Sequence, residues 1–353
     1  MIDTLRQWYE HHLTHRESVI LVIIIALTCF LLATIGDVLM PVLVALILAY
    51  LMQGVADGLM GWGFNKTIAL SGATLLFLGV FLGFTVGIAP LVWRQLVGLI
   101  REAPAMVEAV QAEVAGLIAK YPTMIEQAPI DELMSTLQGQ AASFGQAVLG
   151  FGLSSIPGVL TFAIYMVLIP LMAFFFLKDR EVILRWVLSF LPDDRPQLDQ
   201  IGRAMNVQIA NYVRGKGIEI TIISVVSYVA FKAFDLNYTA LLALSVGLSV
   251  IVPYIGAFLV TIPVILVALF QFGLTGDFYW VVGLYMVIQV LDGNVLVPLL
   301  FSEAVDLHPV AIIIAVLVFG GLWGVWGVFF AIPLATVVNV LLVSWPEASS
   351  GAE

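Results

Sequence analysis

The first apolar stretch of the chain reads Val19-Ile-Leu-Val-Ile-Ile-Ile-Ala-Leu-Thr-Cys-Phe-Leu-Leu-Ala-Thr-Ile-Gly36 and contains no charged residue. A helix of about 20 such residues crosses the hydrocarbon core of a bilayer. The stretch is too long for the apolar region of a signal peptide and has no small-residue cleavage site, so it predicts a retained membrane span. It holds the only cysteine, Cys29, so an internal disulfide is excluded.

The composition of the whole chain agrees with a membrane protein. Hydrophobic residues make up 61% of the sequence and charged residues 11%, whereas soluble domains carry about 25% charge. The net charge of −10 argues against a nucleic-acid partner, because phosphate binding needs a basic face. No phosphate loop, GxSxG, HExxH or paired cysteines occur. We therefore predict no enzyme, no cofactor and no metal site.

Apolar runs of spanning length recur along the sequence. The fold class that they predict is an all-α polytopic membrane protein of about eight transmembrane helices with an amphipathic helical insertion. The sixth and eighth runs are longer than one crossing and contain Pro and Gly, so we expect them to be broken or re-entrant. The second follows the first after only Gly36 and Asp37, which predicts a tight hairpin with Pro41 in the first turn of its second helix. The runs are 19–36, 38–56, 67–93, 156–177, 217–234, 238–272, 278–300 and 308–344.

The positive charges predict the orientation in the membrane. All 14 Lys and Arg residues lie before residue 233, and seven of them fall in 178–216. Since cytoplasmic loops are rich in Lys and Arg, this segment and both termini are expected on the cytoplasmic side of the membrane. The predicted organisation is transmembrane helices at 1–93, a periplasmic amphipathic segment at 94–155, a span at 156–177, the basic segment at 178–216, a membrane region with broken helices at 217–344 and a cytoplasmic tail at 345–353.

Ionisable and amide side chains within the apolar runs are candidates for a transport pathway. Burying such groups at membrane depth is costly, so they usually line a cavity. Glu219 lies near the start of the fifth run, and Asp292 and Asn294 lie in the seventh. Gln289 precedes Asp292 by one helical turn and shares its face. Alternatively, Asp292 caps a helix at the membrane interface.

Two Pro/Gly interruptions share a pattern of Gly, small residue, Phe, bulky apolar residues and Ile-Pro. Paired interruptions in separate apolar runs predict discontinuous helices that meet at a transport site. The residues concerned are Pro253, Gly256 and Pro263 in the first segment and Gly324, Gly327 and Pro333 in the second.

Other glycines and one histidine have simpler interpretations. Gly79, Gly83 and Gly87 repeat every four residues, and Gly320 and Gly324 repeat the spacing. This pattern lets helices approach closely, within or between subunits. His308 precedes Pro309 at the head of the last run and either caps that helix or titrates to couple protons to transport.

A set of segments along nearly the whole chain has a recognisable order and spacing. The segments are 41–50, 175–179, 211–216, 253–257, 291–298, 307–309, 319–327 and 332–333. In these segments the chain resembles the autoinducer-2 exporter family of bacterial permeases. The resemblance implies a homo-oligomer of pentameric type in the bacterial inner membrane, in which a mobile transport unit moves against a fixed scaffold. It also implies export of autoinducer-2 or sodium/proton antiport, and it matches Asp292 to the acidic residue that the family carries before Gly-Asn.

Three functions remain open from the sequence. The first is a secondary transporter that moves a small solute through an alternating-access or elevator-type movement, with the outward direction that the family resemblance implies. The second is a sodium or potassium/proton antiporter that uses Asp292 with Glu219 or His308. The third is a membrane scaffold or assembly protein that holds partners through 94–155. The expected partners are the lipid bilayer, copies of the same chain and a small-molecule or ion substrate.

Overall fold

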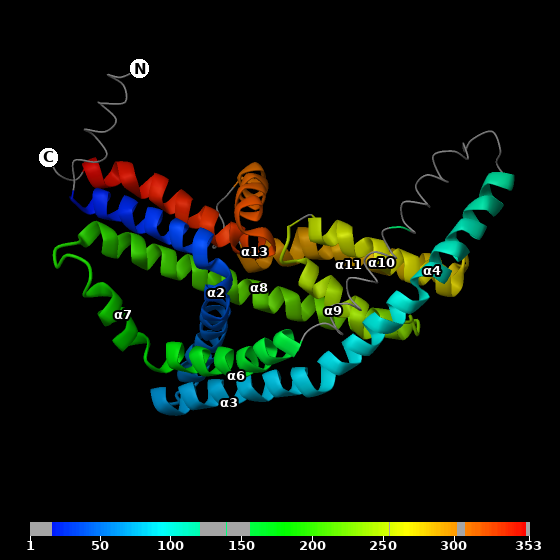
Figure 1. The fold of residues 1–353 in the computed structure, drawn as a ribbon, viewed down its shortest axis with the longest axis horizontal. Helices are drawn as coiled ribbons and strands as arrows, with labels where there is room; N and C mark the ends of the chain where they lie inside the picture. The colour runs from blue at the N-terminus through cyan, green and yellow to red at the C-terminus, as the bar shows by residue number, and fades with distance from the viewer. Residues whose placement is uncertain (1–15, 121–138, 140–155, 254, 302–307, 351–353) are drawn as a thin grey trace, which may run out of the picture. The chain divides into compact units, whose positions relative to one another are not determined.

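A computed structural model describes residues 16–120, 139, 156–253, 255–301 and 308–350. Within these ranges the chain is helical and contains no strand (Figure 1). The elements are α2 (Arg16–Gly61), α3 (Lys66–Gly83), η1 (Phe84–Ile88), α4 (Ala89–Lys120), α6 (Ile156–Lys178), α7 (Arg180–Leu188), α8 (Pro196–Ala233), α9 (Thr239–Ser249), α10 (Ile255–Phe272), α11 (Gly276–Leu291), η2 (Asp292–Leu296), α12 (Val297–Phe301) and α13 (Pro309–Ser350); η1 and η2 are single π-turns.

Five helical stretches of the described chain are long and apolar enough to cross a membrane, and three shorter apolar helices accompany them. The predicted all-α multi-pass class is therefore confirmed, whereas the number of eight crossings stays a prediction. The long stretches are Val38–Gly61, Lys66–Ala112, Thr161–Lys178, Ile255–Phe272 and Gly276–Phe301, and the short ones are Thr239–Ser249, Val310–Gly324 and Gly327–Thr336.

The predicted division between the first two apolar runs is confirmed. α2 consists of two helices that meet at a kink at Ile35 (φ −127°, ψ 19°), one residue before the predicted Gly36-Asp37 junction (Figure 1), and the pairing of the two helices as a hairpin stays a prediction. Pro41 lies inside α2, where it removes the hydrogen bond to Asp37 and its ring crowds that carbonyl. This weakens the turn from Asp37 to Pro41, just after the kink, and the two helices join without a connecting loop.

The predicted break in the sixth apolar run is confirmed. Helix α9 ends at Ser249 and α10 begins at Ile255, so the run forms two consecutive helices. With a rise of 1.5 Å per residue, the 11 residues of α9 span about 16 Å, roughly half the hydrocarbon thickness. Helix α9 is thus too short to cross a bilayer.

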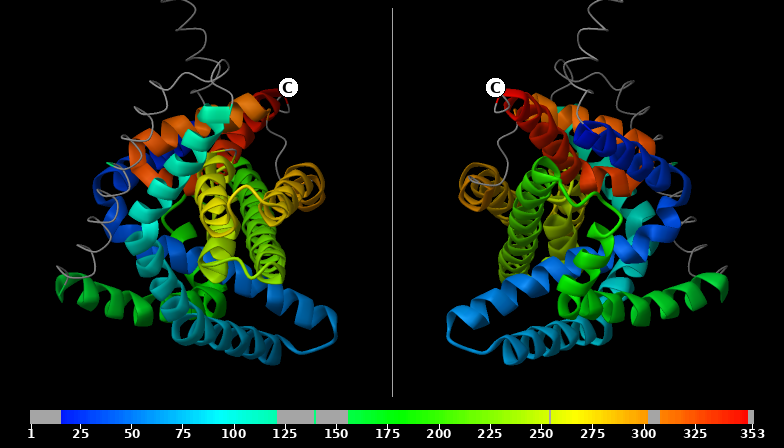
Figure 2. Two further views of the ribbon diagram at one scale, coloured as in Figure 1. Left: turned by 90° about the vertical axis from the view of Figure 1, so that its right-hand side faces the viewer. Right: turned by 90° about the vertical axis from the view of Figure 1, so that its left-hand side faces the viewer.

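The eighth run is also broken, as predicted, at one residue inside α13. Gly324 has φ 61° and ψ −142°, a region that is accessible essentially to glycine only. The two arms pack on each other, with Ala315, Val316 and Phe319 before the break against Val328 and Ala331 after it. The arms leave the break in different directions (orange and red in Figures 1 and 2), so α13 forms a helix–turn–helix.

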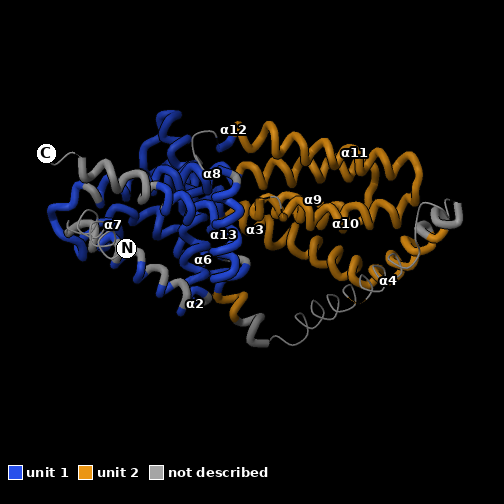
Figure 3. The backbone as a smooth tube through the Cα atoms, turned by 90° about the horizontal axis from the view of Figure 1, so that it is seen from above, with its two compact units in different colours: residues 1–77, 165–217, 300–353 blue, residues 78–164, 218–299 orange. Residues whose placement is uncertain are grey.

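The chain divides into two compact units, each described here by itself (Figure 3). Unit 1 contains residues 1–77, 165–217 and 300–353, and unit 2 contains 78–164 and 218–299. The largest apolar core belongs to unit 2, where α4, α8, α9, α10 and α11 meet around Phe231, Val264 and Tyr285.

The amphipathic helix predicted at the start of 94–155 is part of unit 2. Met106, Val107 and Val110 of α4 are buried, the last two against Leu266 and Leu269 of α10. The second predicted stripe, at 133–148, lies outside the described residues. In unit 1, Lys66 of α3 bridges Glu181 of α7 at 2.7 Å, and the Lys66 ammonium holds the pKa of the Glu181 carboxyl below its usual range.

Candidate transport site

Asp292 begins the π-turn η2 in the middle of the helical stretch Gly276–Phe301. Its Oδ1 atom is buried. The extra residue of a π-turn leaves backbone groups out of α-helical register, and such turns are frequent at functional sites. Because helix continues on both sides of Asp292, its position does not match the alternative of a cap at the end of a helix.

Asn294, in the same turn, is exposed and donates from Nδ2 to the carbonyl oxygen of Val290, 2.9 Å away. The side chain therefore satisfies a carbonyl of its own helix where the π-turn disturbs the backbone pairing. Its amide oxygen carries no recorded bond to the described residues, and it stays a candidate for solute contact.

A chain of hydrogen bonds connects Gln289 to α10. Gln289 donates from Nε2 to the Tyr285 hydroxyl at 3.0 Å, and that hydroxyl lies 2.7 Å from Thr261 Oγ1. Thr261 in turn donates to the carbonyl oxygen of Ala257 at 2.7 Å. Tyr285 is fully buried. The network holds the helix that carries Asp292 against the first turns of α10.

Sequence reasoning missed Tyr285 and Thr261 because each stands alone among apolar residues. Their only signal was the spacing of Tyr285, Gln289 and Asp292, which places the three on one helical face. The sequence predicted that Gln289 and Asp292 share one helical face. The structure shows that this face packs on α10 through Tyr285 and Thr261.

Glu219 lies on α8 and is 1% exposed. Two turns further along the same helix, the Ser227 hydroxyl is buried, with no hydrogen-bond partner among the described residues. Polar groups buried at this depth are costly, so this face of α8 is a second polar feature of unit 2.

The break before α10 is set by Gly256. A Cβ atom on Gly256 would lie 1.8 Å from the carbonyl oxygen of Ser249, the last residue of α9. The break occupies residues between Ser249 and Ile255 and contains Pro253, whereas Pro263 lies inside α10. The predicted interruption at 253–263 is thus displaced toward the N-terminus.

The break in α13 has the same local arrangement in unit 1. A Cβ on Gly327 would lie 1.7 Å from the carbonyl oxygen of Phe319, and Gly324 rather than Gly327 makes the turn. Pro333 lies inside the second arm, as Pro263 lies inside α10. The repeated pattern therefore specifies a glycine pressed on the end of the preceding helix and a proline within the next one.

His308 forms the entry to α13. Its Nδ1 accepts a hydrogen bond from the backbone N–H of Val310 at 3.2 Å, and its carbonyl oxygen accepts one from Ala311 at 2.8 Å. The side chain is exposed. The geometry is that of the predicted helix cap, and a role in proton coupling stays a prediction.

The predicted packing glycines divide into two groups. Gly320 packs within α13, since a Cβ there would lie 2.7 Å from Val328 Cγ2. Gly79, Gly83 and Gly87 have open space at the Cβ position and are exposed. They make no close helix contact within the described chain.

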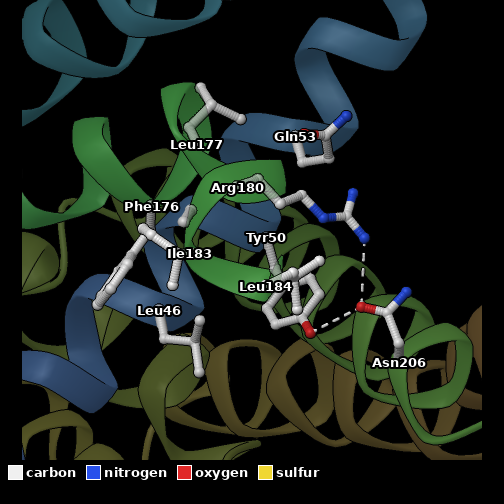
Figure 4. Close-up of a pocket in the computed structure, with 10 residues that line it drawn as sticks. Leu46, Tyr50, Gln53, Phe176, Leu177, Arg180, Ile183, Leu184 and Asn206 are labelled. Atoms are coloured by element: carbon white, nitrogen blue, oxygen red, sulfur yellow. Dashed lines mark hydrogen bonds between the residues drawn. The ribbon is translucent and has the colours of Figure 1, made fainter. Parts of the chain in front are cut away.

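A pocket in unit 1 was missed from the sequence (Figure 4). It encloses about 150 Å³ between α2, α6, α7 and α8, and its walls are mainly apolar. Tyr50 donates to Asn206 Oδ1 at 3.0 Å, and Arg180 Nη2 lies 3.4 Å from the same oxygen. The lining residues are Leu46, Ala49, Tyr50, Gln53, Phe176, Leu177, Arg180, Ile183, Leu184 and Asn206.

Apolar helices of spanning length, two glycine-set helix breaks and a buried carboxylate oxygen in a π-turn are the features of a polytopic membrane transport protein. Comparison with known sequences gives the family: the chain belongs to the AI-2E family transporters, whose family profile matches residues 19–347.

Relatives cover the chain almost completely. It is 42% identical over 353 residues to the Escherichia coli (strain K12) protein PerM, named as a permease, with 100% of both chains covered. It is 24% identical over 312 residues to YrrI of Bacillus subtilis, named as a transport protein, covering 88% of this chain and 87% of that one. A Thermotoga maritima transport protein is 25% identical over 278 residues, with 78% and 79% covered. The resemblance read from the sequence motifs is confirmed.

Proposed function

We propose that the protein is a secondary transporter of the bacterial inner membrane that exports a small solute by an alternating-access or elevator-type movement. The main observation in support is that Oδ1 of Asp292 is buried within a π-turn. A carboxylate oxygen at this depth is a candidate to hold a polar solute or a coupling ion.

The two helix breaks support this assignment. Residues at a break have backbone groups without helical partners, and at membrane depth these are tolerated only where protein or water satisfies them. The π-turn at Asp292 lies on the helix that Tyr285 bonds to α10, and α10 begins directly after one such break. In unit 2 the carboxylate and the break therefore belong to one hydrogen-bonded pair of helices.

The proposal is tested by flux through the purified protein. Liposomes with and without the protein are loaded with autoinducer-2, the signal from which the family takes its name, and then with a panel of small polar metabolites. Protein-dependent release of at least one compound supports a solute transporter. Equal leakage from both kinds of liposome across the whole panel contradicts it.

A second candidate is a sodium or potassium/proton antiporter. The observation that favours it is the buried face of α8 with Glu219 and Ser227, because a buried carboxylate and hydroxyl are suited to carry protons through an apolar region. Liposomes that contain a pH-sensitive dye separate the two functions. Proton movement on addition of sodium or potassium supports the antiporter, and its absence removes it.

The orientation of the chain in the membrane and the contact between its copies are further parts of the proposal. We place both termini and 178–216 in the cytoplasm on the distribution of Lys and Arg. We propose that copies of the chain associate through the exposed face of Gly79, Gly83 and Gly87, because glycines at this spacing allow close helix contact.

A further inference from the structure

The pocket of unit 1 combines an apolar wall with one cationic side chain. Leu46, Phe176 and Leu184 supply apolar surface, and the Arg180 guanidinium points across the cavity toward Asn206 (Figure 4). The volume of about 150 Å³ equals that of an engineered apolar cavity that takes up benzene. A short hydrocarbon segment of about six carbons is therefore the size of group that fits.

Arg180 has little of its hydrogen-bonding capacity in use. It contacts Asn206 Oδ1 at 3.4 Å, while a guanidinium carries five N–H donors. It forms no ion pair with a carboxylate of the described residues. Two other cations of the basic segment are paired, Arg195 with Asp199 at 3.1 Å and Arg214 with Asp57 at 2.8 Å.

The acidic side chain that bonds to the lining residue Gln53 is already paired with a cation. Asp57 accepts from Arg214 at 2.8 Å and from Gln53 Nε2 at 2.5 Å. Gln53 thus directs its amide N–H away from the cavity, and the negative charge of Asp57 is compensated by Arg214. Glu181, next to Arg180 in the chain, is paired with Lys66, and Arg180 is the charged side chain that lines the pocket, so the pocket favours an anion.

The place of Arg180 in the chain sets the depth of the pocket. It follows the apolar stretch Thr161–Lys178 by two residues and begins α7. Side chains at the end of a spanning helix lie at headgroup depth, and basic pockets between helices on the cytoplasmic side bind lipid headgroups. Guanidinium forks bind phosphate with two parallel hydrogen bonds.

We propose that this pocket binds an oxyanion carried on an apolar chain, with a phosphate or carboxylate on Arg180 and the chain along Leu46, Phe176 and Leu184. Two sources supply this chemistry: an anionic phospholipid of the surrounding leaflet and a soluble amphiphilic anion. The site is separate from Asp292, so it does not depend on the proposed transport function.

The test measures thermal stability of the full-length protein in a non-ionic detergent. Dioleoyl phosphatidylglycerol and dioleoyl phosphatidylcholine are added in parallel as the lipid arm, and octyl phosphate and octyl glucoside as the soluble arm. A ligand that binds only the folded protein raises its melting temperature. We expect the anionic member of at least one pair to raise it more than the neutral member.

Substitutions locate the effect. Arg180→Gln keeps much of the side-chain length and removes the charge, so the increment specific to the anion should fall by at least about half. Arg185→Gln, on the exposed face of the same helix, should keep it. Leu184→Trp fills the cavity from an exposed position and should abolish the increment while Arg180 is still present.

The outcomes are separable. An increment with phosphatidylglycerol alone assigns the pocket to lipid, and one with octyl phosphate alone assigns it to a soluble anion. Equal effects of the anionic and neutral members in both pairs overturn the proposal. An undiminished anionic increment in folded Leu184→Trp also overturns it, whatever the behaviour of Arg180→Gln.

Discussion

The Tyr285 hydroxyl lies 2.7 Å from Thr261 Oγ1 and joins α11 to α10 inside the core of unit 2. Tyr285 also accepts from Gln289, one turn before Asp292. The Tyr285 hydroxyl therefore joins the helix of the π-turn to α10 by hydrogen bonds, in addition to the apolar packing of the two helices.

Removal of that hydroxyl should weaken both the fold and the transport step. Tyr285→Phe removes the hydroxyl to which the Gln289 amide and the Thr261 hydroxyl bond, and leaving them unpaired in the core should lower the free energy of unfolding by about 1–3 kcal/mol. We expect a fall in melting temperature of a few degrees together with a lower flux. Tyr279→Phe is the matched control, because Tyr279 lies on the same helix and is 60% exposed. Equal stability and flux in the two variants would show that the network does not hold the helix.

Gly256 and Gly327, the two clamped glycines that lie against a backbone carbonyl at the helix breaks, should tolerate no side chain. In Gly256→Ala and Gly327→Ala the new methyl would lie within 2 Å of a backbone carbonyl oxygen, and backbone cannot move aside as a flexible side chain does. We expect loss of folded, monodisperse protein in size-exclusion chromatography. Gly283→Ala on the neighbouring helix α11 and Gly321→Ala on α13 have open space at the Cβ position, and both should purify as the native protein does. Native behaviour of both clamped variants contradicts the geometry of the breaks.

The exposed glycine face predicts a subunit contact. Gly83→Leu adds bulk where the described chain offers open space, so the subunit should fold normally while its association is weakened. Cross-linking in the membrane should change from oligomer to monomer, with an unaltered melting temperature of the monomer. An unchanged cross-linking pattern excludes this face from the contact.

The orientation of the chain in the membrane can be tested by labelling single cysteines. Cys29 is replaced by serine, and single cysteines are placed at Asp193 and Glu108, which are both exposed. A membrane-impermeant maleimide should label Glu108→Cys in intact cells and Asp193→Cys only in inverted vesicles. The reverse pattern would place the basic segment outside.

Much of the fold follows from the sequence, because bilayer length and helix-breaking residues act locally. The break after Ser249 and the one at Gly324 were predicted from Pro and Gly in long apolar runs. The division of α2 was predicted at Gly36-Asp37, and the non-helical dihedral angles lie next to that pair, at Ile35. The angle between the two helices was not predictable, since a Gly-Asp pair is compatible with both a kink and a closed turn.

The site was predictable only in part. Asp292 and Gln289 could be identified from the sequence as polar residues in an apolar run, but the hydrogen-bond partner of Gln289 depends on how two helices pack. The pocket at Arg180 draws on α2, on the consecutive helices α6 and α7, and on α8, so no local pattern contains it. In contrast, the shared Gly–Pro pattern carried more information than its length suggested, because both glycines occupy equivalent positions after a break.

The most direct measurement compares flux through Asp292→Asn with flux through the wild-type protein in liposomes, for whichever solute or ion the wild type is found to carry. Asn keeps the shape of the side chain and removes the charge. Asp277→Asn, exposed in the first turn of α11, is the control. We predict that Asp292→Asn folds and assembles normally and loses at least about nine-tenths of the flux, while the control retains it. Flux at the wild-type rate through folded Asp292→Asn would contradict the central assignment.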